Sequence, residues 1–425
     1  MDKNRNLNDL ETVIRECVKC GACQAVCPTY LATRKEGSVA RGKITLAAAV
    51  LEKEADLEER LQQDISMCLM CGSCMEKCPN KVPTHEIVGA IRRAVTDNQG
   101  LSLIGKGVST LLSKKFLMKT VTKSGALVSP LLFRKVPETS GLRLRFPSPV
   151  MKGRTIPKLP VRNLFDRLPE QIIGKPDKPR VGFFAGCALT YLYPETGKIM
   201  VDILREMGCS VFFPKSQKCC GIPALSSGNG ELVQSLAENN VKAFADKEID
   251  FIITACASCN GGIGEYYRTM KADMIDFTGK VIDFSVFLKQ QGFFELLAES
   301  KPWSDPKKVT YHDPCHLKTQ GITREPRELL KSLPNVDFVE MENASACCGL
   351  GGTFSVYHYE TSKEIGARKL PGLQESGAEL IATACPGCIM QLQDVINHGG
   401  LKVKAVHILE LIAQALKGTD NVEHK

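Results

Sequence analysis

Eight cysteines in two short runs near the N-terminus carry the first chemical signal. The runs "CVKCGACQAVCP" and "CLMCGSCMEKCP" share the spacing C-x2-C-x2-C-x3-C-P, with thiols at Cys17, Cys20, Cys23 and Cys27 and at Cys68, Cys71, Cys74 and Cys78. Thiolates spaced this closely can surround a small metal centre from one stretch of chain. Pro28 and Pro79 turn the chain away after the last cysteine, because proline fixes φ and cannot continue a helix.

This spacing resembles that of the bacterial ferredoxins, in which such runs hold 4Fe-4S clusters and the fourth cysteine of each run ligates the other cluster. The resemblance implies two cubane 4Fe-4S clusters, one on Cys17, Cys20, Cys23 and Cys78 and one on Cys68, Cys71, Cys74 and Cys27. A pair of zinc sites is the alternative. Zinc usually takes two separated pairs of ligands rather than four cysteines in one compact run, so the spacing favours iron–sulfur clusters.

Length and composition predict a globular protein of two or three domains. The chain has 425 residues, of which 43% are hydrophobic and 24% charged. Its first residues are charged and lack an apolar segment, so we expect no secretory signal and a cytoplasmic location. In a reducing cytoplasm the 19 cysteines are expected to be metal ligands or redox groups rather than disulfides.

The segments around the two runs predict helices. Residues 40–67 carry apolar residues at helical spacing and predict one helix between the runs. A second helix is predicted with Thr84 as its N-cap and Ile87, Ile91 and Val95 on one face. This pattern resembles the helical ferredoxin modules found beside flavoprotein dehydrogenases, and we assign residues 1–100 to such an α-helical domain with two 4Fe-4S clusters.

Residues 101–178 predict a basic, proline-rich linker. Between Leu101 and Arg180 there are 17 Lys and Arg against 4 Asp and Glu, and eight prolines lie between Pro137 and Pro179. The first half predicts amphipathic helices, which either lie on an anionic membrane face or an acidic partner, or pack on the protein itself. No run of eighteen apolar residues occurs, so membrane contact is expected to be peripheral, on the inner face of the cell membrane. Aromatic residues are too sparse here for nucleic-acid stacking, and we expect no nucleic-acid partner.

The second half alternates strand and helix patterns and contains an internal repeat. "RVGFFAG", "DFIITAC" and "ELIATAC" predict buried strands, with helix-periodic segments between them. Matching cysteines lie 128 or 129 residues apart, at Cys187, Cys219, Cys220, Cys256 and Cys259 in the first copy and at Cys315, Cys347, Cys348, Cys385 and Cys388 in the second. Cys209 alone is left over, as a buried small apolar residue.

These two C-x31-CCG-x35/36-CxxC copies resemble the CCG domains of the heterodisulfide reductase catalytic subunit. The order of the units, a helical ferredoxin, a basic linker and two CCG domains, is similar to that of the membrane-associated form of this reductase subunit. It is also similar to that of the iron–sulfur subunit of glycolate oxidase and its lactate-oxidising relatives. The resemblance implies two repeated α/β CCG domains, at residues 179–300 and 301–425. It also implies one or two noncubane 4Fe-4S clusters, one on each set of five cysteines. Gly221 and Gly349 are expected to let the backbone approach these clusters.

Polar residues beside Cys315 admit two interpretations. His312, Asp313 and His316 could donate protons or hydrogen bonds to a cluster, or His312 and Asp313 could only cap the turn after "KVTY". We expect positioning roles for them rather than catalysis, and the sequence identifies no catalytic residue.

The resemblance implies an electron-transfer subunit of a glycolate or lactate dehydrogenase complex. No strand-associated GxGxxG or Walker motif occurs, so we expect no flavin in this chain. The hydroxy-acid chemistry is then expected on an FAD-binding partner subunit. An electron-transfer flavoprotein or a quinone-reactive membrane subunit is a further expected partner. The alternative is a catalytic subunit resembling heterodisulfide reductase, which reduces a thiol disulfide at a noncubane cluster.

Overall fold

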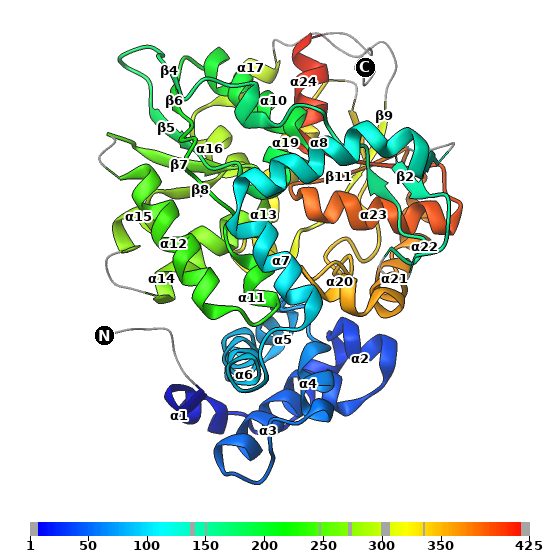
Figure 1. The fold of residues 1–425 in the computed structure, drawn as a ribbon. Coiled ribbons are helices and arrows are strands. Elements are labelled where there is room, and N and C mark those ends of the chain that lie inside the picture. The colour runs from blue at the N-terminus through cyan, green and yellow to red at the C-terminus, as the bar shows by residue number, and fades with distance from the viewer. Residues whose placement is uncertain are drawn as a thin grey trace.

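A helical unit and two α/β units make up the chain (Figure 1). The computed structural model describes residues 7–136, 141–148, 151–245, 248–270, 274–298, 307–334 and 336–417. In Figure 1 the blue N-terminal helices lie below the two α/β units, and the cyan helices that follow them cross over the front. The boundary predicted between residues 300 and 301 lies outside the described residues.

The N-terminal unit is helical, as the apolar spacing predicts. Its elements are η1 (Leu7–Leu10), α1 (Glu11–Arg15), η2 (Ala22–Ala25), α2 (Pro28–Thr33), η3 (Glu36–Ser38), α3 (Ala40–Leu51), α4 (Glu59–Ser66), α5 (Ser73–Lys77) and α6 (Thr84–Gln99). Ile87, Ile91 and Val95 of α6 are buried in its core. The helix therefore presents the predicted apolar face, and only its start differs, because Pro83 is the N-cap and Thr84 is the first helical residue.

The single helix predicted over residues 40–67 is wrong. The chain forms α3 and α4 there, with a turn between them in which Lys53 has a φ of 59°. The acid-rich stretch "EKEADLE" after Leu51 supplies few apolar side chains to bury, so the helix ends. The turn lets both helices pack against α6.

The described part of the linker, residues 101–178, forms helices and short strands. It contains α7 (Leu103–Ser113), α8 (Lys115–Leu132), a small antiparallel sheet of β1 (Phe133–Lys135), β2 (Gly141–Leu144) and β3 (Ile156–Pro157), then η4 (Leu164–Asp166) and β4 (Gln171–Ile172). Both predicted amphipathic helices are present and pack against the α/β units. Within the ranges described here, no helix is both long and apolar enough to cross a membrane.

The first α/β unit is a mostly parallel sheet with the strand order β4-β6-β5-β7-β8. Its strands are β5 (Arg180–Phe183), β6 (Ser210–Phe212), β7 (Phe251–Thr254) and β8 (Val281–Asp283), with β4 antiparallel at the edge. Its helices are α9 (Gly186–Tyr191), α10 (Pro194–Glu206), α11 (Ile222–Ser226), α12 (Gly230–Phe244), α13 (Ala257–Asn260), η5 (Gly261–Tyr266), α14 (Tyr267–Met270), α15 (Ile275–Gly279), α16 (Phe284–Gln290) and α17 (Phe293–Ala298).

The second α/β unit repeats this topology, with the order β10-β9-β11-β12 and all strands parallel. The strands are β9 (Lys307–Tyr311), β10 (Val336–Phe338), β11 (Leu380–Thr383) and β12 (Lys404–His407). The helices are α18 (Cys315–Lys318), α19 (Arg324–Lys331), α20 (Phe354–Tyr357), α21 (Tyr359–Ala367), α22 (Leu370–Ser376), α23 (Pro386–Gly399) and α24 (Ile408–Lys417). The sequence repeat is thus a structural repeat.

The repeated cysteines follow the carboxyl ends of adjacent strands. Cys187 and Cys256 follow β5 and β7, and Cys315 and Cys385 follow β9 and β11. Parallel strands bring their carboxyl ends to one edge of the sheet, where ligand sites of open α/β sheets form. The two units meet through these edges, because the Ala257 amide donates to the Ala384 carbonyl at 3.1 Å and His407 Nε2 donates to the Ala255 carbonyl at 3.0 Å.

Candidate functional site

Two cavities divide the cysteines of the N-terminal unit. One, of about 410 Å³, is lined by Cys17, Cys20, Cys23 and Cys78, and also by Cys74, which lines both cavities. The other, of about 420 Å³, is lined by Cys27, Cys68, Cys71 and Cys74. The fourth cysteine of each run therefore lies with the first three cysteines of the other run, which is the grouping that exchanged ligands require.

Each run wraps its cavity with the same backbone conformation. Lys19 and Gly21 in the first run have φ values of 55° and 84°, and Met70 and Gly72 at the matching positions of the second run have 54° and 73°. These left-handed residues turn the chain between successive cysteines so that the three thiols face one centre. Glycine adopts this conformation without strain, which explains the CxxCGxC pattern of both runs.

Two buried cations stand beside the second cavity. The Lys43 ammonium lines it and donates to the carbonyls of Gly37, at 3.0 Å, and Ser38. The Arg92 guanidinium is buried and donates to the Cys68 carbonyl at 2.7 Å. Burial lowers the pKa of both side chains. Four thiolates around a 4Fe-4S cluster leave net negative charge, which these cations would offset. The helical periodicity of the sequence did not predict that either cation is buried beside the cysteines.

The five cysteines of the first CCG copy converge at one edge of its sheet. The Cys219 thiol donates to Cys187 Sγ at 3.5 Å, and Cys220, Cys256 and Cys259 are buried beside them. Hydrogen bonds from Cys219 and Cys259 lower the pKa of Cys220 well below its usual value. A Cβ atom on Gly186 would lie 2.5 Å from Cys259 Sγ, so only glycine leaves the sulfur room there.

The second copy gathers its cysteines in the same way. Cys348 Sγ lies 3.6 Å from Cys388 Sγ, and the Gly349 amide donates to Cys347 Sγ at 3.4 Å. Hydrogen bonds from Cys347 and Cys388 lower the pKa of Cys348, the counterpart of Cys220. Cys315 lies beside Cys347, and these two are less buried than Cys348, Cys385 and Cys388. Each copy thus brings together all five cysteines that the sequence repeat assigned to it.

The glycines after the cysteine pairs stand at turns that a side chain would strain. Gly221 and Gly349 have nearly equal φ values, 94° and 95°, which favour glycine. A Cβ on Gly349 would lie 2.3 Å from the Ser362 carbonyl oxygen, and one on Gly221 would lie 3.3 Å from a Val233 methyl carbon. These glycines let the chain turn close beside α12 and α21, which carry Val233 and Ser362.

Thiols also meet between the groups. Hydrogen bonding to Cys347 and burial raise the pKa of Cys71, so the second ferredoxin run touches the second CCG copy. Hydrogen bonds from Cys256 and Cys388 lower the pKa of Cys385, so the two CCG copies touch as well. The sulfur atoms of the ferredoxin unit, the second CCG copy and the first CCG copy therefore form one series.

The contact between the ferredoxin unit and the second copy is tightly packed. A Cβ on Gly72 would lie 2.5 Å from a Thr319 methyl carbon, and Leu69 packs with Phe354 and Ile365. The Lys318 ammonium donates to the Ser73 hydroxyl at 3.0 Å and lies 3.1 Å from the Glu76 carboxylate. The sequence did not predict this contact, because the two loops are about 250 residues apart in the chain and local sequence patterns do not show which distant loops touch.

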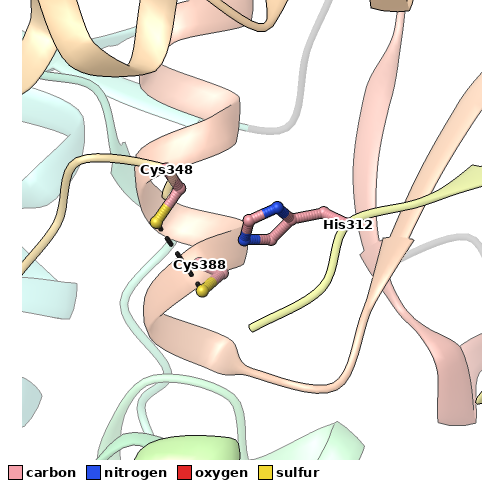
Figure 2. Close-up of side chains that lie close together, drawn as sticks. All are labelled: His312, Cys348 and Cys388. Atoms are coloured by element: carbon pink, nitrogen blue, oxygen red, sulfur yellow. Dashed lines mark hydrogen bonds between the residues drawn. The ribbon is translucent and has the colours of Figure 1, made fainter. Parts of the chain in front are cut away.

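The three polar residues around Cys315 take different positions. Asp313 accepts two hydrogen bonds from Arg327, at 2.6 and 2.9 Å, and its amide donates to the Ala344 carbonyl, so it anchors the turn after β9. His316 lies against Gly261 of the first copy. His312 is buried and points its ring at Cys348 and Cys388 (Figure 2).

The donor sets fit iron–sulfur clusters. Eighteen thiols in four groups offer soft ligands, which disfavour magnesium, calcium or manganese. Cys209 stands apart, and burial raises its pKa to about 11. Cys17, Cys20, Cys23 and Cys78 would hold one cluster, and Cys27, Cys68, Cys71 and Cys74 a second; each CCG set would hold one more.

Comparison with known proteins agrees with this organisation. Residues 13–82 match the 4Fe-4S dicluster domain family, and residues 181–264 and 309–393 each match the cysteine-rich CCG domain family. The probable glycolate oxidase iron-sulfur subunit of Bacillus subtilis is 31% identical over 424 residues, 95% of this chain and 94% of that protein. The chain belongs to this family of iron–sulfur subunits. The predicted fold class, a helical ferredoxin unit followed by two CCG repeats, is confirmed.

Two further relatives of this chain differ in their names. The glycolate oxidase iron-sulfur subunit of Escherichia coli is 26% identical over 427 residues, 98% of each chain. One of the proteins that form the dihydromethanophenazine:CoB-CoM heterodisulfide reductase of Methanosarcina barkeri is 27% identical over 430 residues, 94% of this chain and 93% of that protein. This chain is therefore similar to subunits of both enzyme types that the cysteine pattern resembles.

Replacing Cys78 by Ser tests the grouping of the ferredoxin cysteines. Because Cys78 lines the cavity of Cys17, Cys20 and Cys23, we expect the variant to lose that cluster, about four iron atoms per chain, and to keep the one beside Cys68. Iron analysis and EPR of anaerobically purified protein measure this, with Cys209→Ser as the control. Loss of the cluster at Cys68, Cys71 and Cys74 alone would show that the fourth ligands are not exchanged.

Proposed function

We propose that this chain relays electrons from an FAD-binding 2-hydroxy-acid dehydrogenase subunit, acting on glycolate or lactate, toward a quinone or another membrane acceptor. The unbroken series of cysteine groups carries the proposal. The names of the Bacillus subtilis and Escherichia coli relatives support the hydroxy-acid assignment. The proposal includes two cubane clusters on the ferredoxin runs and a noncubane cluster on each CCG set.

The buried contacts between groups suit such a relay. When bound, iron–sulfur clusters supply one-electron transfer at potentials set by charge, hydrogen bonds and burial. The protein's part is to hold four sites in a row and to exclude water between them. It does so through Cys71 against Cys347 and through Cys256 against Cys385, all within hydrophobic or sulfur-rich surroundings.

The far end of the series opens beside the linker helices. A cavity of about 320 Å³ next to Cys187 and Cys219 is lined by Leu111 and Leu112 of α7 and Lys115 and Met118 of α8. Lys115 is half-buried there, and burial lowers its pKa to about 8. The first CCG copy thus has its opening under α8, at the opposite end of the series from the cavity of Cys17.

The outer face of α8 suits an anionic membrane surface. Phe116, Leu127 and Leu131 are 82%, 64% and 78% exposed on it, and the exposed Lys123 lies among them, while the neighbouring Lys119 pairs with Asp166 at 2.7 Å. The sequence from Leu101 to Lys135 contains no acidic residue. Apolar side chains that enter the lipid, with lysines that pair with anionic headgroups, give a helix that lies in the interface. We therefore place the peripheral membrane contact at α8, above the opening of the first CCG copy.

Disulfide reduction on this chain is the second candidate function. The name of the Methanosarcina barkeri relative and the complete five-cysteine sets in both copies favour it. The contact of Cys256 with Cys385 also brings the two sets together, as a reaction shared by two centres would need. The relay is preferred, because it accounts for the ferredoxin unit, the CCG copies and the face of α8 together.

Activity assays with separated subunits test the relay. We expect this chain alone to oxidise neither lactate nor glycolate with an artificial dye, and the flavoprotein partner to do so without it. Cys259→Ser and Cys388→Ser should stop transfer to the physiological acceptor, down to the rate measured without this chain, while the partner's dye activity stays unchanged. Cys209→Ser serves as the control. Cleavage of a disulfide by the chain alone, driven by reduced viologen and abolished by either substitution, would contradict the relay.

Vesicle binding tests the face of α8. We expect the protein to sediment with vesicles that contain anionic lipid, less so at high salt, and not with purely phosphatidylcholine vesicles. The pair Phe116→Glu and Leu131→Glu should weaken binding about tenfold or more, since each side chain contributes on the order of 1 kcal/mol of apolar burial. Ile173→Glu is the matched control, because Ile173 is 85% exposed outside α8. Equal binding by the pair and the control would contradict the assignment.

A further inference from the structure

The imidazole ring of His312 is buried without a nitrogen or oxygen partner among the described residues. It is 1% exposed, and Cys348 is the side chain that shares a hydrogen bond with the ring. A buried polar group left without a partner is destabilising, because it has given up its hydrogen bonds to water. A buried ring of this kind is expected to bind a group that the protein itself does not supply, and the side chains around the ring indicate which group that is.

The ring faces two cysteine sulfurs of the second CCG set. Potential ligand atoms of His312, Cys348 and Cys388 all lie within 4.8 Å of one another. Figure 2 shows the far edge of the imidazole pointing toward the two sulfurs, which lie 3.6 Å apart. One nitrogen and two sulfur donors therefore converge on a single point, at the site where five cysteines already meet.

The backbone and the neighbouring residue hold His312 in this position. Its amide donates to the Ala382 carbonyl of β11 at 2.9 Å, which extends the sheet by one residue. Asp313 follows at once and is fixed by its two hydrogen bonds to Arg327. The ring therefore leaves the end of β9 from an anchored backbone rather than from a loop.

The first copy lacks this nitrogen. The residue three positions before the first cysteine is His312 in the second copy and Phe184 in the first, and the next is Asp313 against Ala185. Phe184 is fully buried and offers no ligand atom. The two cysteine sets are alike, but their surroundings differ in one donor at the same position.

We propose that His312 is an iron ligand of the cluster at the second CCG set, so that this centre has a mixed sulfur and nitrogen shell and the first CCG centre has sulfur ligands alone. The proposal rests on a cluster at that set. Imidazole is an established iron ligand, and replacing thiolate by histidine ligands raises the potential of an iron–sulfur centre. The two CCG centres then differ in potential, with the higher value at the second copy, next to Cys71.

Pulsed EPR on protein labelled with ¹⁵N-histidine tests this proposal without any partner or activity assay. We expect the anaerobically purified full chain to show a ¹⁵N coupling of directly ligated strength on the signal of the second CCG centre. His312→Phe, which installs the residue of the first copy, should abolish the coupling and shift the midpoint potential of that centre to a lower value. His316→Gln tests the other histidine beside this set, whose Nδ1 lies 3.7 Å from Cys315 Sγ, and it should keep the ¹⁵N coupling because its ring packs on Gly261 rather than facing Cys348 and Cys388.

Each other outcome contradicts the proposal in a distinct way. A full complement of about sixteen irons without a histidine coupling would leave the clusters in place and remove His312 from their ligands. A coupling lost in His316→Gln would assign the nitrogen to His316. About twelve irons with one zinc would mean that the second CCG set holds no cluster. If His312→Phe fails to load iron, the wild type and His316→Gln decide between these outcomes.

Discussion

The contact of thiol with thiol across unit boundaries is the constraint on which the rest of this structure depends. Cys71 must reach Cys347, and Cys256 must reach Cys385, or the cysteine groups become separate sites. Both contacts need backbone segments to approach closely, which explains the glycines at the boundary. Gly72 packs on Thr319 and Gly261 packs on His316, where a Cβ atom would lie 2.5 and 2.9 Å from its neighbour. The linker helices then cover the end of the series rather than merely joining two domains.

Much of the cluster-binding chemistry could be predicted from the sequence, because the spacing of cysteines in the chain is determined by the geometry with which they surround a metal cluster. The pattern of Cys17 to Cys27 and the 128- and 129-residue repeat marked the cysteines that the structure gathers, and the resemblance to bacterial ferredoxins implied the exchange of Cys27 and Cys78 between the two runs. The strand predictions before Cys256 and Cys385 are confirmed by β7 and β11. These signals are local, since each depends on residues that are close in the chain.

What the sequence did not predict depends on residues far apart in the chain. Nothing near Lys43 or Arg92 marks them as buried cations, because their partners are backbone carbonyls, which every residue has. The break between α3 and α4 follows from the packing of both helices on α6. The periodicity of apolar residues does not show this packing and therefore predicted a single helix. His312 was noticed through its neighbour Cys315, but its position depends on Cys348 and Cys388, which follow it by 36 and 76 residues.

The repeat also shows how two copies of one fold can diverge in chemistry. Both keep the strand order, the five cysteines and a glycine with φ near 95° after the cysteine pair. The differences lie around them, in His312, Asp313 and the buried Lys369 of the second copy against Phe184 and Ala185 of the first. The central claim of four filled centres in one chain is tested most directly by iron analysis of anaerobically purified protein. The account predicts about sixteen irons per chain, and a value near eight with full occupancy of the ferredoxin sites would contradict it.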